Sequence, residues 1–178
     1  ILFRLVGSEM CIRDSLLTTS NKRLDLLQLV SKAVKSMSEG ELLQMEKARK
    51  MDITEEIYYQ IIRQKTASLV AACCATGASS VVTDSDTISL LENIGINVGM
   101  AFQIKDDIFD YGSSEKIGKP TGIDIKERKL TLPLIYTLNK VDKSQKRMII
   151  NTIKKDKQNQ KKVKEIIDLV ISEGGITY

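Results

Sequence analysis

The stretch 99–111 constrains the fold most, because it places three acids in an otherwise apolar run with helical spacing. Asp106 and Asp110 lie one helical turn apart on the same face, and Asp107 stands about 100° round from Asp106. The three carboxylates can therefore border one groove. Carboxylates this close repel one another unless a cation lies among them, and their oxygens are the ligands that Mg²⁺ prefers. The stretch predicts a mostly buried helix that carries a magnesium site.

The alternative is that this D-D-x-x-D pattern is only a solvated helix face, as most short acidic groupings are. Two further segments favour the metal site: K-T-A-S-L at 65–69 and G-K-P-T-G-I-D-I-K-E-R-K-L-T-L-P at 118–133. A basic loop after an acidic helix supplies cations for the phosphate oxygens that metals leave uncovered. In this order, and with F-Q before the acids, the segments resemble the C-terminal half of the trans-prenyltransferases, the polyprenyl diphosphate synthases.

The resemblance implies head-to-tail prenyl transfer. In that reaction an allylic diphosphate ionises, its carbocation alkylates isopentenyl diphosphate, and a proton is lost. By the same resemblance Asp106, Asp107 and Asp110 hold Mg²⁺. The residues expected at the substrates are Lys65, Lys119 and Lys129 on the diphosphate, Thr66 beside Lys65, and Gln103 facing the reacting isoprenoid.

The chain departs from the family pattern in one respect, because no second D-D-x-x-D occurs upstream of the acidic helix. We therefore expect an all-α, partial isoprenoid-synthase-type helical bundle that lacks its N-terminal helices. The parent is expected to be a synthase and this chain to be inactive alone. The alternative is a non-catalytic partner subunit of a heteromeric prenyl synthase.

The sequence distinguishes less clearly between the enzyme types that act on prenyl diphosphates. D-I-T-E-E-I-Y at 52–58 and K-T-A look closest to long-chain enzymes such as octaprenyl diphosphate synthase, but farnesyl and geranylgeranyl synthases share much of this pattern. Class I terpene synthases also use metal-bound aspartates in an α-helical bundle. The F-Q pair and the G-K-x-x-G-x-D loop argue against them.

Residues 1–15 look foreign to the domain. The string L-V-G-S-E-M-C-I-R-D at 5–14 resembles a translated sequencing adaptor, and its charges leave no apolar core for a signal peptide. We assign 1–15 as a non-native leader and 16–178 as the C-terminal part of a polyprenyl synthase domain.

Charge and hydropathy limit the partners. No apolar run reaches a bilayer-spanning length, so no stable membrane insertion is expected. The formal charge of +4 comes from residues 141–178, where nine Lys or Arg stand against five Asp or Glu. In the lysine-rich stretch 143–164, helical spacing favours a solvated face over a nucleic-acid or anionic-membrane surface, and no aromatic side chain is interleaved for base stacking. By family resemblance, the parent is expected to be a cytoplasmic homodimer without nucleic acid.

Helix signals divide the rest of the chain. Thr54 and Asp84 are candidate N-caps, Gly77 and Gly112 are candidate stops, and Thr131 with Pro133 begins a further helix. The expected helices are 21–47, 55–75, 85–111, 144–154 and 161–173, with a loop at 113–128.

Small residues carry two further expectations. Gly95 and Gly99 leave a strip where another helix backbone or a substrate chain can approach closely. Cys73 and Cys74 are expected to be small core residues.

A final motif, G-E-x-x-Q at 40–44, resembles a family motif near the allylic substrate, although Glu41 is equally well explained as a surface residue.

Overall fold

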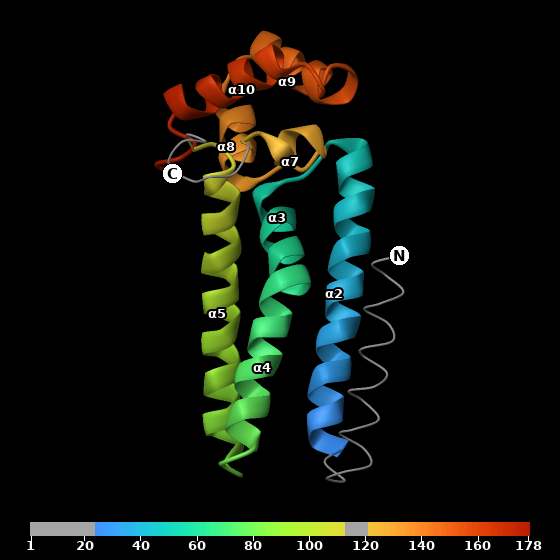
Figure 1. Ribbon diagram of the computed structural model, residues 1–178, viewed down its shortest axis with the longest axis vertical. Coiled ribbons are helices and arrows are strands. Elements are labelled where there is room, and N and C mark those ends of the chain that lie inside the picture. Colours follow the sequence, from blue (N-terminus) through green and yellow to red (C-terminus); the bar gives the residue numbers. More distant parts are fainter. Residues whose placement is uncertain (1–23, 113–120) are drawn as a thin grey trace.

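The computed structural model describes residues 24–112 and 121–178, and no strand occurs among them, which confirms the all-α prediction. Three long helical segments, called rods below, form a bundle (Figure 1). They are α2 (Leu24–Lys50), a composite helix made of α3 (Glu55–Ile62), the π-helical turn η1 (Arg63–Ala67) and α4 (Ser68–Ser79), and α5 (Ser85–Phe109). The composite helix is the middle rod, because it contacts both α2 and α5.

The starts of α3 and α5 follow the predicted caps. The Thr54 hydroxyl accepts a hydrogen bond from the backbone amide of Ile57, and the Asp84 carboxylate accepts one from the amide of Thr87. Each side chain satisfies an amide that the first turn of a helix leaves without a partner.

The end of α4 differs from the prediction. Gly77 lies inside the helix, which continues to Ser79, so Gly77 is not its stop. The capping residue Ser80 keeps right-handed dihedral angles, and no residue of the following turn adopts a positive φ. Because this turn needs no left-handed residue, it gives a glycine no advantage. The other predicted stop, Gly112, lies two residues after Asp110, which is the C-cap of α5.

Gly95 and Gly99 bring the backbones of α4 and α5 together, as predicted. A Cβ atom on Gly95 would lie 2.7 Å from the Ala71 Cα, and one on Gly99 would lie 2.6 Å from the Ala67 Cα. Real side chains do not tolerate such distances, so the two rods can pack this closely only because both positions are glycine.

Four further helices lie across one end of the bundle (Figure 1): α7 (Ile123–Lys126), α8 (Leu132–Lys140), α9 (Lys143–Lys155) and α10 (Gln160–Ser172). Helices α9 and α10 match the predicted helices 144–154 and 161–173 to within about a residue. For α8 only the start was predicted, and it begins with Pro133 in its first turn as expected. The largest fully buried aliphatic side chains of the described residues are here: Ile125, Leu134, Ile135, Ile149, Ile153, Ile166 and Val170. Burying each such side chain stabilises the fold by about 1.5–3 kcal/mol.

The predicted loop at 113–128 is only partly described. Its first eight residues, 113–120, lie outside the described part, and α7 forms a helical turn where a loop was expected. Gly122 precedes α7 with a φ of 73°, and a Cβ there would meet the Val163 side chain at 2.6 Å. Glycine at this position therefore serves both the turn and the packing of α10.

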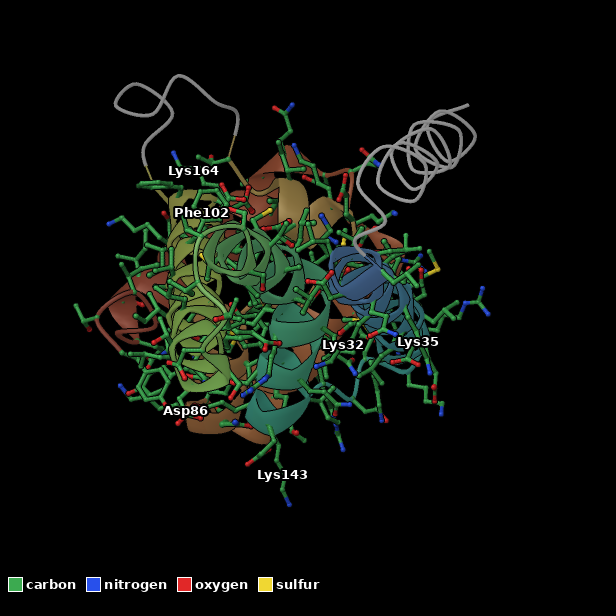
Figure 2. The ribbon with its side chains drawn as sticks, turned by 90° about the horizontal axis from the view of Figure 1, so that it is seen from below. Lys32, Lys35, Asp86, Phe102, Lys143 and Lys164 are labelled. Carbon is green, nitrogen blue, oxygen red and sulfur yellow. The ribbon has the colours of Figure 1, made fainter. Side chains whose placement is uncertain are left out.

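Two expectations about burial are wrong. The helix α5 is not mostly buried, because Leu90, Ile94, Val98 and Phe102 are 46–65% exposed, and Phe102 lies at the periphery when the bundle is viewed along its long axis (Figure 2). These side chains repeat every four residues and form one face that no described helix covers. Cys73 is exposed and is not a core residue. None of the described helices combines the length and apolar character needed to cross a bilayer.

We predict that Gly99→Ala lowers the free energy of unfolding by about 1–3 kcal/mol, because the added methyl group overlaps Ala67 and the rods must move apart. Gly77→Ala is the matched control, since a Cβ there meets nothing within 4 Å and alanine favours the helix by about 1 kcal/mol. Urea denaturation followed by circular dichroism measures both. Equal stability of the two variants would contradict the close backbone contact.

Candidate functional site

The predicted site residues converge where α3, η1 and α5 meet the segment 124–131. A cavity of about 90 Å³ lies there. Its polar lining comes from every one of these elements and from α2: Gln44, Tyr58, Lys65, Thr66, Gln103, Asp106, Asp107, Asp124, Lys129 and Thr131. Six of the eight residues predicted for catalysis, substrate and metal thus border one cavity. The other two are Asp110 and Lys119.

Asp107 is the most buried acid of this site, with 6% of its surface exposed. One carboxylate oxygen accepts a hydrogen bond from the Tyr58 hydroxyl at 2.7 Å, and the other accepts one from the Gln103 amide at 2.8 Å. The Gln103 oxygen in turn accepts the Thr66 hydroxyl at 2.8 Å. The resulting chain, Thr66 to Gln103 to Asp107 to Tyr58, fixes side chains from α3, η1 and α5 relative to one another.

Burial governs the ionisation of this chain. Burial raises the pKa of Asp107 to about 6. The hydrogen bonds from Tyr58 and Gln103 favour the ionised carboxylate and so lower the pKa in part. Burial, followed by the charge of Asp107, also raises the pKa of Tyr58 far above its usual value. Tyr58 therefore stays protonated and acts as a donor to Asp107 over the physiological range of pH.

The three predicted metal ligands lie in three different environments. Asp106 is exposed and lines the cavity. The two oxygens of Asp110 accept hydrogen bonds from the backbone amides of Ile123 and Asp124, at 2.9 Å and 3.1 Å. Asp110 thus ties the end of α5 to α7. Among the residues that the structure describes, no three acids, cysteines or histidines come together closely enough to hold a metal ion.

Lys65 projects from η1 towards α2. Its ammonium nitrogen lies 2.7 Å from a Glu41 carboxylate oxygen and 2.7 Å from the Gln44 side-chain oxygen. Gly40 permits this approach, because a Cβ on it would lie 2.8 Å from the backbone nitrogen of Lys65. An ammonium group carries three donors, so one remains for a ligand in the cavity. Glu41 therefore contacts a candidate site residue and is not simply a surface acid.

Lys129 supplies a second ammonium group to the lining of the cavity. It pairs with Asp124 at 3.3 Å and with Glu127 at 2.6 Å. Burial alone would lower the pKa of Lys129, but these two acids outweigh burial and raise it. Burial raises the pKa of Asp124, which Lys129 partly offsets. Lys129 thus remains charged.

Sequence reasoning missed Tyr58, and it placed Lys119 where the structure gives no description. Tyr58 lies seven residues, two helical turns, before Lys65, so the spacing alone puts both side chains on a similar side of the helix. That signal was available. Lys119 falls in 113–120, outside the described residues, and its role stays a prediction.

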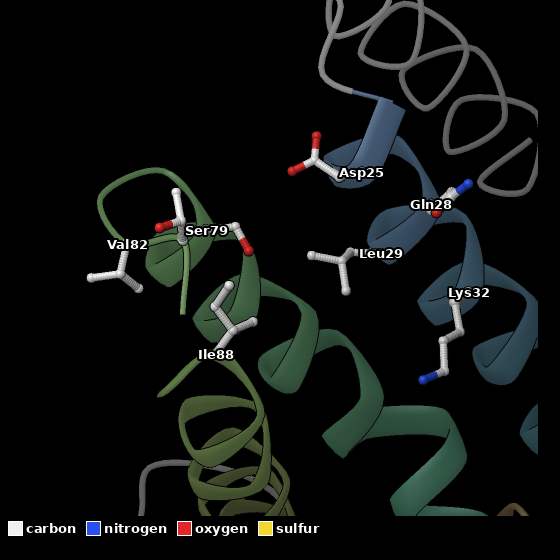
Figure 3. Close-up of a pocket in the computed structure, with 8 residues that line it drawn as sticks. Asp25, Gln28, Leu29, Lys32, Ser79, Val82 and Ile88 are labelled. Atoms are coloured by element: carbon white, nitrogen blue, oxygen red, sulfur yellow. The ribbon is translucent and has the colours of Figure 1, made fainter. Parts of the chain in front are cut away.

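A larger cavity lies at the opposite end of the bundle, between the first turns of α2, the end of α4 and the start of α5 (Figure 3). Its volume is about 520 Å³, and Asp25, Leu29, Ser79 and Ile88 help to line it. It contains none of the predicted site residues. We place the candidate site at the small cavity instead, because the convergent polar groups and the shifted pKa values are found there.

Comparison with known proteins adds a family context to this geometry. Residues 6–170 match the family model described as polyprenyl synthetase. Octaprenyl diphosphate synthase of Escherichia coli K12 is 35% identical over 150 residues, which cover 84% of this chain and 46% of that protein. Geranylgeranyl diphosphate synthase of Saccharolobus solfataricus is 33% identical over 139 residues, covering 76% of this chain and 42% of that protein.

A solved structure agrees. The polyprenyl synthase of Caulobacter crescentus CB15, complexed with calcium and isoprenyl diphosphate, superposes with a TM-score of 0.83 at 30% sequence identity. The match covers 90% of this chain and 49% of that one. The chain spans about half the length of the curated relatives it matches.

The shifted pKa of Asp107 predicts a pH dependence of stability. The carboxyl group has a pKa of about 6 in the fold against an unperturbed value of 3.8. Between these values the native state binds more protons than the unfolded state, so the free energy of unfolding falls as pH rises from about 4 to about 6. The fall amounts to roughly 3 kcal/mol at most, and Asp110 and Asp124 contribute in the same direction.

Asp107→Asn should flatten this pH dependence, as measured by urea denaturation at a series of pH values. Asp84→Asn is the control, because the Asp84 pKa is lowered, not raised, and asparagine caps helices equally well. A slope that is unchanged in Asp107→Asn and lost in Asp84→Asn would contradict the assignment.

Proposed function

Because the chain belongs to the polyprenyl synthetase family, we propose that its cavity is the diphosphate-binding half of a prenyltransferase site. The reaction is head-to-tail condensation of an allylic diphosphate with isopentenyl diphosphate. The observation that carries the proposal is the convergence of two ammonium groups, Lys65 and Lys129, with the carboxylates of Asp106 and Asp107 around one cavity.

This arrangement suits the main difficulty of the reaction, which is the charge that builds up on the departing pyrophosphate. Cations fixed in advance stabilise that charge most effectively in a partly water-excluded site. Lys65 and Lys129 both line the cavity and are held by acids, so their orientation is set before a substrate binds. Lys119 is proposed as a third diphosphate contact on the strength of the sequence motif.

Thr66 and Gln103 are proposed to face the allylic part of the substrate. Their hydrogen bond to each other, and that of Gln103 to Asp107, fix both side chains. Two oxygen dipoles held in this way next to the cavity favour positive charge, such as that of an allylic cation. The same chain connects the dipoles to the acidic helix, so a disturbance at Asp107 should reach Thr66.

Mg²⁺ is the proposed cofactor. Carboxylate oxygens from Asp106, Asp107 and Asp124 border the cavity, and an all-oxygen donor set is what Mg²⁺ prefers. Asp106, whose side chain is exposed at the cavity, would hold the ion. Metal contacts by Asp107 and Asp110 stay predictions, because hydrogen bonds engage both carboxylate oxygens of each. When bound, the ion would neutralise the developing charge on the pyrophosphate.

We further propose that the 178-residue chain does not turn over alone, since its sequence contains a single D-D-x-x-D motif. A homodimeric and cytoplasmic parent enzyme remains part of the proposal. The product length is open, because the relatives that match include geranylgeranyl and octaprenyl synthases. The retained Lys65, Asp106, Asp107 and Lys129 argue against a non-catalytic partner subunit, whose site would be free to decay.

Binding of geranyl diphosphate in the presence of Mg²⁺ tests the proposed site. Lys65→Ala should weaken binding at least tenfold, because a charge-assisted hydrogen bond contributes about 1.5–3 kcal/mol. Lys50→Ala is the matched control, since Lys50 also pairs with a glutamate but lies outside the cavity. Isothermal titration calorimetry measures both variants. Equal affinities for the two would contradict the diphosphate assignment.

Turnover provides a separate test. The purified chain, incubated with farnesyl diphosphate, isopentenyl diphosphate and Mg²⁺, should give no elongated product in an extraction assay. Formation of longer prenyl diphosphates that Lys65→Ala abolishes would contradict the proposed inactivity of the chain, while leaving the site assignment intact.

A further inference from the structure

The outer side of α9 is a strongly basic surface. Residues 143–164 contain nine Lys or Arg and one Asp. Five of the basic residues are exposed along α9 itself, and we refer to them as the basic face: Lys143, Lys146, Arg147, Lys154 and Lys155. The Arg128 side chain adds a further cation, because it donates a hydrogen bond to the Lys154 carbonyl at 3.0 Å.

The basic face is not neutralised by neighbouring acids. No carboxylate of the described residues lies within 4.0 Å of any of its five cations, and the nearby pair of Lys162 with Asp156 is separate from it. On α2, by contrast, every described lysine has an acidic partner: Lys32 with Glu92, Lys35 with Glu39, Lys47 with Asp52 and Lys50 with Glu46. The lysines of α2 thus each lie beside an acid, whereas the basic residues of α9 have no acid of the described residues within ion-pair distance.

The position of α9 leaves its basic residues on the outside of the molecule. Ile149 and Ile153 are fully buried against the core, so the opposite side of the helix faces away from the bundle. Helices α9 and α10 lie across one end of the molecule (Figure 1). Viewed along the long axis, Lys143 and Lys164 project on opposite sides of that end (Figure 2). Exposed cations thus lie on two sides of that end, with Lys143 of the basic face on one side and Lys164 of α10 on the other.

We propose that the basic face docks the protein on an anionic lipid surface. Basic residues near such a surface are attracted to its negative potential over about one Debye length. Met148, which is 42% exposed and lies among these cations, supplies an apolar group that can enter the headgroup region. The acids Asp142, Glu165 and Asp168 are also exposed nearby and limit the attraction to the α9 side.

The same features favour lipid over nucleic acid. The stretch from Asp142 to Ser172 contains no aromatic residue on which a base could stack. Its nine basic residues include a single arginine, and arginine is the side chain that makes bidentate hydrogen bonds to phosphates and guanine edges. Diffuse attraction of lysines to a charged plane needs neither feature. The proposal is independent of the prenyl-transfer chemistry, because no residue of the basic face borders the site cavity.

Flotation with lipid vesicles tests this docking. The chain should bind vesicles of mixed phosphatidylglycerol and phosphatidylcholine at about 0.1 M salt and be released at about 1 M salt, where the Debye length falls to about 3 Å. Vesicles of phosphatidylcholine alone should not bind it. The triple variant Lys143→Gln, Arg147→Gln, Lys154→Gln should bind at least tenfold more weakly, because each basic residue contributes severalfold to the affinity.

The control is Lys32→Gln, Lys35→Gln, Lys50→Gln, which changes the net charge equally but on α2. Circular dichroism should show both triple variants folded. The proposal is overturned if neither lipid binds, if neutral vesicles bind as well as anionic ones, or if the two triple variants lose affinity equally. Tighter binding to duplex DNA than to anionic vesicles, lost in the α9 variant, would also overturn it and assign the face to nucleic acid.

Discussion

The site depends on the hydrogen bonds that the buried carboxylate of Asp107 accepts. A charge in this position is costly to desolvate, and burial therefore raises the pKa of Asp107. Tyr58 from α3 and Gln103 from the preceding turn of α5 compensate part of it. Because Gln103 also accepts the Thr66 hydroxyl, the same carboxylate orients a side chain of η1. One buried acid thus links two rods of the bundle and places the polar groups that border the cavity.

The packing of small residues makes this linkage possible. Gly99 against Ala67, and Gly95 against Ala71, hold α5 close to the middle rod, while Gly40 brings α2 against the π-helical turn. The π turn Arg63–Ala67 therefore lies between two close backbone contacts, and it carries both Lys65 and Thr66. π-Helical turns are rare and occur mostly as single turns at functional positions. Here, Lys65 points to α2 and Thr66 points to α5, so the turn distributes its two polar side chains to opposite neighbours.

Much of this could be predicted from the sequence, because it depends on local rules. The caps at Thr54 and Asp84, the proline that begins α8 and the close contact at Gly95 and Gly99 each follow from the chemistry of one residue type. The failures have a different origin. Helix spacing did not indicate that amides thirteen and fourteen residues further along would donate hydrogen bonds to the Asp110 oxygens, and a metal contact by Asp110 stays a prediction. The exposure of α5 and Cys73 likewise depends on which helices surround them. Spacing along one helix determines a face, whereas only the tertiary structure determines what covers that face.

The most direct test of the account is a crystal structure of the chain soaked with Mn²⁺ and pyrophosphate, with the metal located by its anomalous scattering. The account predicts Mn²⁺ bonded to an oxygen of Asp106 or Asp107, with pyrophosphate oxygens in contact with the ammonium groups of Lys65 and Lys129. Mn²⁺ or pyrophosphate bound instead at the larger cavity beside Leu29 and Ile88, with the cavity at Asp107 empty, would contradict it.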